Sequence, residues 1–166
     1  MNITLRALEP EDLSLLYRIE NDKRLWCYGE TTSPYSQYQL RNYLQSVTND
    51  AFRDGQVRMA IATEQGETLG FADLQNISAL HGRAEVGIVI LPECQRRGAA
   101  LAALRQLEDY AHCQLHLHQL IAFVSADNQP SLALFEKAGY KKTATLPEWL
   151  STPEGWADMC VFSLRL

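Results

Sequence analysis

The chain has 166 residues, of which 46% are hydrophobic and 21% charged, and its formal net charge is −5 at pH 7. This length and composition are typical of one folded globular domain, residues 1–166, and exclude a disordered chain. The acidic balance provides no overall basic field for nucleic acid, and no apolar run is long enough to cross a membrane, so we expect neither kind of partner.

The first half of the chain predicts a strand, two helices and a hairpin. Alternating apolar side chains indicate the strands, and proline followed by acidic residues is typical of a helix start. The elements expected here are a strand over 3–8, helices that begin at Pro10 and at Ser33-Pro34, and strands over 57–63 and 68–74 joined by a turn.

The second half predicts strands that alternate with helices. We expect a strand over 83–91, a helix after Gly98, a strand over 120–124, a helix over 132–138 that Gly139 ends, and strands at about 141–146 and 156–164 around a loop with Pro147, Pro153 and Gly155. This order predicts an α/β fold with a mixed sheet and helices on both faces. A ligand is expected where neighbouring strands separate, near the loop after Leu91.

Cysteine and histidine usage gives no sign of a disulfide framework or a metal centre. The four cysteines (Cys27, Cys94, Cys113 and Cys160) form no Cys-x-x-Cys pair, and the first residues do not resemble a signal peptide. We therefore expect reduced thiols in a cytoplasmic protein. His112, His116 and His118 lie where the long helix should end, a position that the helix dipole favours for histidine, so we expect no metal site there.

The segment that follows the strand over 83–91 has the layout of an anion site: strand, short loop, glycine, helix. The first turn of a helix carries unpaired N–H groups, which hold phosphate well. Gly98 permits close approach of a ligand, and small Ala99 and Ala100 leave the helix start uncrowded. Arg96 and Arg97 add charge that suits phosphate. An ordinary strand-to-helix turn explains the hexapeptide alone equally well, whereas P-loop and Rossmann patterns do not fit.

A second block of residues lies downstream of the next strand, and together with the loop it favours an anion site over an ordinary turn. Gln95, Gly98 and Ala100 match the pattern Gln/Arg-x-x-Gly-x-Gly/Ala. The downstream block has a matching asparagine, small residue, Leu-aromatic-Glu-Lys run and Gly-aromatic end, contributed by Asn128, Ser131, Leu134, Phe135, Glu136, Lys137, Gly139 and Tyr140. With both blocks, the chain resembles the GNAT superfamily of N-acetyltransferases. The order of elements is most similar to that of the ribosomal-protein alanine acetyltransferases and the spermidine acetyltransferases.

The resemblance implies a central mixed, mostly antiparallel twisted sheet and acetyl-CoA as co-substrate, with no metal required. It implies that the loop from Gln95 to Ala100 holds the pyrophosphate and that the backbone of Ile88, Val89 and Ile90 pairs with the pantetheine arm, a free N–H there stabilising the oxyanion. Contacts to the CoA arm are expected from Asn128, Ser131 and Phe135, although Asn128 also suits a simple helix cap.

The acceptor is expected to be a primary amine that attacks the thioester directly, in a small amine, a polyamine or a protein N-terminus. A homodimer is common among similar proteins. The alternative from another functional class is a non-catalytic acyl-CoA-binding sensor or scaffold.

Glu85 is the candidate catalytic residue because it interrupts an otherwise apolar strand. It could be a solvated glutamate at a sheet edge. It could also act as a general base through a water, or bind a cationic acceptor. Enzymes that the chain resembles carry a glutamate at this strand position, which favours the functional role.

Phe135 departs from the family pattern, because many similar enzymes place a tyrosine there that protonates the departing CoA thiolate. Three readings remain: another group is the acid, the thiolate leaves unprotonated, or catalysis has been lost. The second is chemically tolerable since a free thiol has a pKa of about 8.5.

Aromatic and acidic residues gather in two further segments whose role the sequence leaves open. Each set is expected either to pack under a loop or to line the acceptor pocket. The sets are Trp26, Tyr28, Glu30, Tyr35 and Tyr38 in the first segment, and Trp149, Trp156 and Asp158 near the C-terminus.

Overall fold

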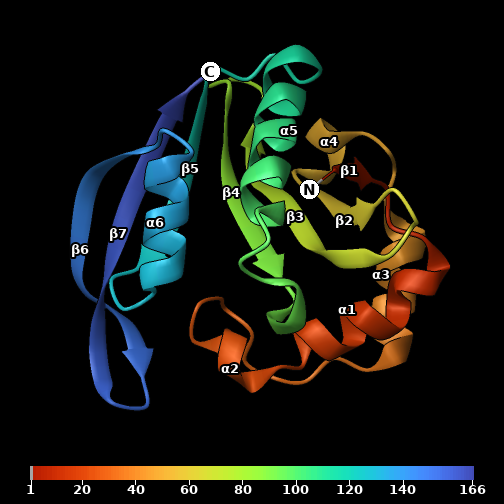
Figure 1. The fold of residues 1–166 in the computed structure, drawn as a ribbon, viewed down its shortest axis with the longest axis horizontal. Helices are drawn as coiled ribbons and strands as arrows, with labels where there is room; N and C mark the ends of the chain where they lie inside the picture. Colours follow the sequence, from red (N-terminus) through yellow and green to blue (C-terminus); the bar gives the residue numbers. More distant parts are fainter. Residues whose placement is uncertain (1) are drawn as a thin grey trace.

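A seven-stranded sheet organises the fold, and the computed structural model describes residues 2–166. The strand order is β1-β2-β3-β4-β5-β7-β6, and the single parallel pair among these neighbours is β4 with β5. The strands are β1 (Ile3–Arg6), β2 (Val57–Thr63), β3 (Thr68–Ser78), β4 (Arg83–Ile90), β5 (Gln119–Ser125), β6 (Lys141–Thr152) and β7 (Gly155–Arg165). The expected mixed, mostly antiparallel sheet is confirmed (Figure 1).

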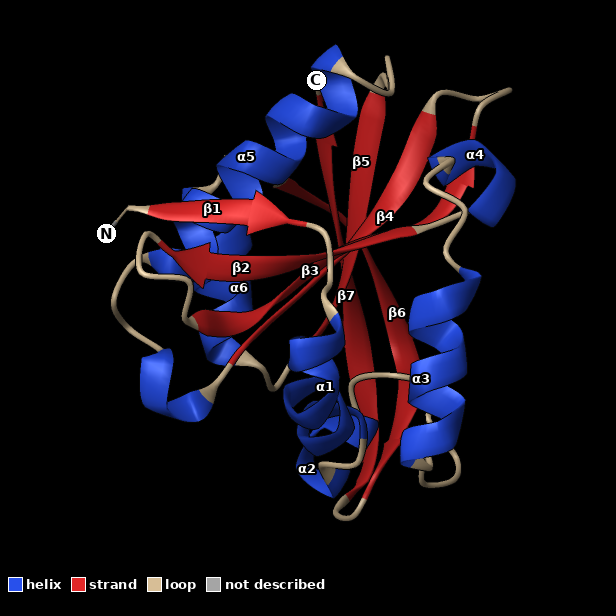
Figure 2. Ribbon diagram, turned by 90° about the vertical axis from the view of Figure 1, so that its right-hand side faces the viewer, coloured by secondary structure: helices blue, strands red, loops and turns tan. Residues whose placement is uncertain are grey.

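Helices cover both faces of this sheet, as expected. The helices are α1 (Leu13–Glu20), α2 (Lys23–Trp26), α3 (Gln37–Ser46), α4 (Ala51–Asp54), α5 (Ala99–Cys113) and α6 (Gln129–Lys137). Figure 2 shows α5 and α6 on one side of the sheet and α3 and α4 on the other. A short 3₁₀ turn, Pro10–Asp12, precedes α1 at the predicted helix start.

The long helix α5 is the main packing element of its face. Its apolar residues recur with helical spacing, so Ala103, Leu104 and Leu107 are each fully buried against the sheet. Gln106 on the same helix binds the edge strand β1: its amide donates to the Ile3 carbonyl (2.7 Å) and accepts from the Leu5 N–H (3.1 Å). The middle of α5 is therefore tied to the edge of the sheet.

The second helix starts later than expected. The predicted start at Ser33-Pro34 is wrong, because α3 begins at Gln37 behind an N-cap at Ser36. There the Ser36 hydroxyl accepts from the Gln39 N–H (3.1 Å) while the Gln39 side chain accepts from the Ser36 N–H (2.8 Å). This reciprocal capping box satisfies the backbone N–H groups of Ser36 and Gln39. A helix start at Ser33-Pro34 does not offer such a pair of bonds.

The prediction of a loop between the last two strands is also wrong. Residues 147–152 belong to β6, which turns at Pro153 directly into β7. Pro147 lies in an irregular stretch of the β6–β7 ladder, where Glu148 has a positive φ of 50° and its N–H donates to Asp158 (2.9 Å). β6 is an edge strand, and edge strands and bulges are the positions in a sheet that tolerate proline.

Asp12 provides a pH-dependent contribution to stability. It is 4% exposed and accepts hydrogen bonds from Arg6 (2.7 and 3.0 Å), the Glu9 N–H (2.8 Å) and the Thr68 hydroxyl (2.8 Å). Burial acts to raise the pKa of Asp12, but the bonds from Arg6, Glu9 and Thr68 outweigh burial and hold it below its usual value. Because the pKa of Asp12 is lower in the folded state than in the unfolded state, its carboxylate stabilises the fold fully at a pH above the unfolded-state pKa. This contribution is lost as the pH falls through the folded-state pKa.

We expect Asp12→Asn to lower the melting temperature at pH 7 by about 5–10 °C, because it breaks a buried charged network. The difference from the parent protein should shrink as the pH falls below about 4, where the unfolded-state carboxyl is protonated. Asp22→Asn is the matched control, since its partner Arg24 is 79% exposed and such surface pairs contribute little. An equal loss at pH 3 and pH 7 would contradict this account.

Candidate active site

The two parallel strands β4 and β5 separate soon after they meet. They pair only from Arg83 opposite Gln119 to Glu85 opposite Ile121. Beyond that point β4 continues beside β3, and β5 continues beside β7. The result is a gap between the carboxyl ends of the two strands, in the place where the sequence predicts a ligand.

Backbone groups of β4 point into this gap. The Leu91 N–H donates to the Leu69 carbonyl of β3 (2.9 Å), and Val89 pairs with Phe71 of the same strand. Because backbone groups alternate in direction along a strand, those of Ile88 and Ile90 face away from β3 and toward the gap. Of the three residues expected to bind the pantetheine arm, Ile88 and Ile90 therefore present their backbone to the gap.

Gln95 ties the following loop to the end of β4. Its side-chain amide donates to the Ile90 carbonyl (3.0 Å). The Gln95 side chain thus fixes the start of the loop that is expected to hold the pyrophosphate, and the backbone of the loop is left to face a ligand.

The loop places two residues in the left-handed region, Arg96 at a φ of 61° and Gly98 at 84°. Alternating backbone conformations of this kind turn successive N–H groups toward one point and form concave anion sites. No atom lies within 4 Å of the Cβ position that a side chain at Gly98 would occupy. The space in front of the glycine is open.

The first turn of α5 completes the anion site. Gly98 is its N-cap without a side-chain cap, and the first hydrogen bond back to it comes from the Ala102 N–H (3.2 Å). Within residues 2–166, the N–H groups of Ala99, Ala100 and Leu101 therefore find no acceptor, and the first turn holds no acidic residue. Arg96 and Arg97 are exposed, so both can supply charge beside these donors.

The N-terminus of α6 lies across the gap, after β5. Asn128 caps this helix, its side chain accepting from the Ser131 N–H (3.3 Å), so the cap role is confirmed. Farther along α6, Phe135 is 4% exposed. Its ring packs edge-on against the ring of Tyr140, with centroids 5.1 Å apart, and stacks on the ring of Phe162, with centroids 6.2 Å apart. The position where the family pattern has a tyrosine is thus part of a buried aromatic cluster.

Glu85 occupies the last paired position of β4 before the gap opens. It is half-buried in a central strand, so it is not the solvated edge residue that the sequence also allowed. Its neighbour on the same face of β4, Gly87, lies opposite Asp73 of β3. A side chain at Gly87 would contact Asp73 at 3.5 Å, so this buried carboxylate lies on the same face of the sheet as Glu85.

Asp73 belongs to a charged network that the sequence analysis missed. Arg58 of β2 donates to Asp73 (2.6 and 3.0 Å) and to Glu20 of α1 (2.5 Å). Burial disfavours the Arg58 cation, but Asp73 and Glu20 raise its pKa well above the ordinary value. Two carboxylates share one guanidinium, so this face of the sheet, which also carries Glu85, has a negative balance. An acidic residue within the apolar run of β3 was the available sequence signal.

The predicted aromatic residues are divided between structure and surface. Trp26 is tied down, because its indole N–H donates to the Glu20 carbonyl (2.9 Å). Tyr28 is exposed, and burial, followed by the charges of Cys27 and Asp127, raises the pKa of its phenol. Tyr35 and Tyr38 are exposed, as are Trp149 and Trp156.

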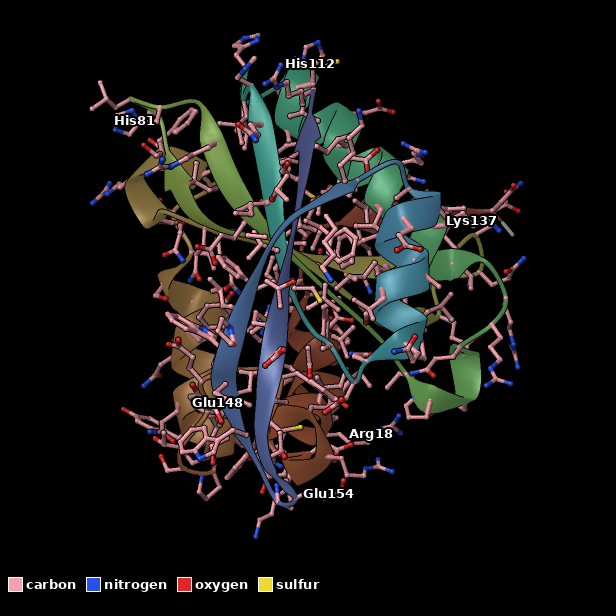
Figure 3. The ribbon with its side chains drawn as sticks, turned by 90° about the vertical axis from the view of Figure 1, so that its left-hand side faces the viewer. Arg18, His81, His112, Lys137, Glu148 and Glu154 are labelled. Carbon is pink, nitrogen blue, oxygen red and sulfur yellow. The ribbon has the colours of Figure 1, made fainter. Side chains whose placement is uncertain are left out.

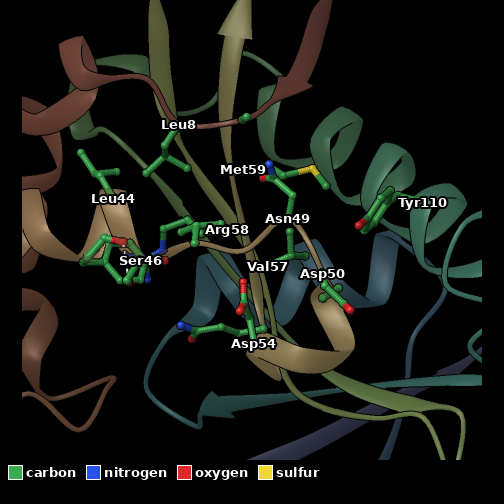
Figure 4. Close-up of a pocket in the computed structure, with 15 residues that line it drawn as sticks. Leu8, Leu44, Ser46, Asn49, Asp50, Asp54, Val57, Arg58, Met59 and Tyr110 are labelled. Carbon is green, nitrogen blue, oxygen red and sulfur yellow. Dashed lines mark hydrogen bonds between the residues drawn. The ribbon is translucent and has the colours of Figure 1, made fainter.

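A cavity of about 560 Å³ lies elsewhere, between α3, α4 and the beginning of β2 (Figure 4). Its lining includes Tyr43, Asp54, Val57, Met59 and Tyr110. The part of β2 that borders it, residues 57–59, is not paired with β1, because β1 ends opposite Ala60. This cavity is distinct from the gap between β4 and β5.

Residues 2–166 contain no group of three or more histidine, cysteine or acidic side chains placed to hold a metal ion, and their four cysteines are free thiols. No helix in this part of the chain is long and apolar enough to span a membrane.

Residues 2–141 match the acetyltransferase (GNAT) domain family. The chain belongs to the GNAT family of acetyltransferases. It is therefore an acetyl-CoA-dependent acetyltransferase. Membership of this family favours an enzyme over the alternative of a non-catalytic binding module. The resemblance seen in the sequence is confirmed.

Individual relatives narrow the comparison. The spermidine N(1)-acetyltransferase of Vibrio cholerae is 29% identical over 88% of this chain and 83% of that protein. The crystal structure of the spermidine N-acetyltransferase from that organism with CoA and spermine is similar with a TM-score of 0.89, at 25% identity over 98% of this chain and 95% of that chain. A dodecameric structure of the Vibrio enzyme has a TM-score of 0.83, at 26% identity over 98% and 93% of the two chains.

Proposed function

We propose that this GNAT acetyltransferase moves the acetyl group of acetyl-CoA to a primary amine of a small polycationic acceptor such as spermidine. The observation that carries the proposal is the position of Glu85, at the point where β4 and β5 separate and on the same face as Asp73 and the Arg58–Glu20 pair. A negatively balanced face beside the gap attracts a cation. The Vibrio relatives act on spermidine, which supports the same acceptor class here.

The donor would lie in the gap. The free N–H groups of Ala99, Ala100 and Leu101, with Arg96 and Arg97, would hold the pyrophosphate. Backbone groups of Ile88 and the N–H of Ile90, whose carbonyl already accepts from Gln95, would pair with the pantetheine arm, and a free N–H of this strand would stabilise the developing oxyanion. Ser131 and Phe135 would border the arm from α6.

Glu85 would act at the acceptor nitrogen. An aliphatic ammonium has a pKa of about 10.4, so it must lose a proton before it attacks at neutral pH. Glu85, through a water, would accept that proton. The N–C bond then forms as the C–S bond breaks, the nitrogen loses its second proton to water to give the neutral amide, and CoA leaves as the thiolate, because Phe135 has no proton to give.

Phe135→Tyr should raise turnover by up to about 100-fold, the lower end of what general acid catalysis contributes, if its hydroxyl reaches the leaving sulfur. Affinity for acetyl-CoA, measured by calorimetry, should change little. Phe162→Tyr is the matched control: it adds the same hydroxyl to the neighbouring ring, which is 1% exposed, and should lower stability without raising turnover. If Phe135→Tyr is no faster than the parent enzyme, a different group is the acid.

Thiol release with a panel of acceptors tests the function itself. Spermidine, a propylamine-like monoamine and a peptide with a free N-terminus are compared at equal concentration, and the products are identified by mass spectrometry. We expect acetylated spermidine to form fastest. Faster acetylation of the peptide would replace the polyamine with a protein N-terminus as acceptor.

We also propose that the enzyme self-associates. The end of the β6–β7 pair extends past β5 and carries Trp149 and Trp156, which are 61% and 68% exposed (Figure 3 shows Glu148 and Glu154 on the same ribbon). Large exposed aromatic residues are typical of interfaces. Light scattering on size-exclusion fractions should give a dimer or a larger assembly, and Trp149→Ser with Trp156→Ser should reduce it. A monomer at micromolar concentration would contradict this.

A further inference from the structure

Two buried oxygen atoms on facing elements have no hydrogen-bond partner in the part of the chain that the structure describes. They are Oε1 of Glu108, on α5, and the hydroxyl of Tyr140, at the junction of α6 and β6. Glu108 is 7% exposed and Tyr140 is 3% exposed. A buried polar atom without a partner typically costs about 1–3 kcal/mol, so two of them where α5 packs against α6 call for an explanation.

The surroundings leave each atom with the other as its partner. Oε2 of Glu108 accepts from Arg105 (2.9 Å), so this oxygen is satisfied and Oε1 is the acceptor that is left free. Burial raises the pKa of Tyr140, and the charge of Glu108 raises it further, so the phenol keeps its proton and can donate. Burial raises the pKa of Glu108 as well, the hydrogen bond and charge of Arg105 act against this shift, and Asp109 adds to it; Arg105 and Asp109 are both on its own helix.

We propose that the Tyr140 hydroxyl donates to Glu108 Oε1 in the working protein and that this bond positions α6 against α5. One bond between them satisfies both orphaned atoms at once. The family pattern accepts either phenylalanine or tyrosine at position 140. In this chain the glutamate on α5 gives the hydroxyl of Tyr140 an acceptor.

The pair acts on the gap through two routes. The helices α5 and α6 begin at Gly98 and Asn128, on opposite sides of the gap, so their mutual position sets its width. The ring of Tyr140 also packs edge-on against Phe135, with ring planes at 77°. Glu108 and Tyr140 are positioning residues. Their effect on acetyl-CoA rests on the proposed function, whereas the bond itself does not.

Removal of the hydroxyl alone tests the bond. Tyr140→Phe keeps the ring and its contact with Phe135, and we expect its melting temperature to fall by about 3–10 °C, as for loss of a buried hydrogen bond to a charged group. If the hydroxyl has no partner, the same change should leave stability unchanged or raise it, and the proposal is then overturned. Tyr110→Phe, on α5, is the matched control, because burial alone raises the pKa of Tyr110.

A double-mutant cycle shows whether Glu108 is the partner. Glu108→Leu should destabilise the protein, and Tyr140→Phe should cost nothing further in that background. Glu108→Gln keeps an acceptor oxygen and should rescue most of the loss. Additive effects of the two changes would contradict a shared bond.

Kinetics separate positioning from general stability. Well below the melting temperature, Tyr140→Phe should raise the KM for acetyl-CoA more than it changes kcat, and Glu108→Gln should restore that KM toward the parent value. An unchanged KM in a destabilised Tyr140→Phe variant would overturn the positioning role. If the protein turns over no amine at all, the proposed function fails, but the stability cycle still decides whether the bond exists.

Discussion

Gly98→Trp should abolish acetyl-CoA binding while the protein stays folded. Gly98 combines a φ of 84° with open space at its Cβ position, so a side chain here strains the backbone and fills the space in front of the free N–H groups of α5. Loss of two or more charge-assisted phosphate bonds corresponds to a rise in Kd of more than about 100-fold, which calorimetry can measure.

Gly55→Trp is the matched control for this prediction. Gly55 also has a positive φ, 69°, and no atom within 4 Å of its Cβ position, but it precedes β2 at the opposite end of the sheet from the loop. This variant carries similar backbone strain and should bind acetyl-CoA normally. An unchanged Kd in a folded Gly98→Trp variant would remove the loop from the binding site.

Glu85→Gln should lower kcat/KM for the amine by about 10²–10⁴-fold at neutral pH, because it removes the proposed base without changing side-chain size. Affinity for acetyl-CoA should be nearly unchanged. The loss should narrow as the pH rises toward about 10, where the free amine no longer needs a base.

Glu67→Gln removes the same charge from an exposed turn and serves as the control. A Glu85→Gln enzyme with parent activity from pH 6 to pH 9, at subsaturating acceptor, would show that Glu85 takes no part in the reaction. If the affinity of Glu85→Gln for acetyl-CoA also falls, the substitution has disturbed the gap that binds the donor as well as the acceptor site.

Elements with strong local signals were predictable from the sequence. β2 begins and ends where expected, and α6 begins behind an asparagine N-cap and ends before Gly139. Helical spacing of apolar residues and the glycine before α5 located the proposed anion site. The Gly98 loop needed no tertiary information, because its donors come from one strand-to-helix connection.

Features that depend on partners distant in the sequence were not predictable in this way. Proline and glycine indicated a loop at residues 147–155, yet the chain pairs as two long strands since β6 is an edge that tolerates Pro147. The network of Arg58, Asp73 and Glu20 joins two strands and a helix, so no local pattern announces it. α2 and α4 are too short for the helical period to detect.

Hydrogen exchange measured with and without acetyl-CoA tests the central claim most directly. The account predicts that acetyl-CoA protects the backbone amides of Ile88 and of Ala99 to Leu101, which face the gap between β4 and β5, while residues 49–57 at the cavity beside α3 and α4 exchange as before. Protection at residues 49–57, with unchanged exchange at Ile88 and the start of α5, would place the donor in that cavity and contradict the account.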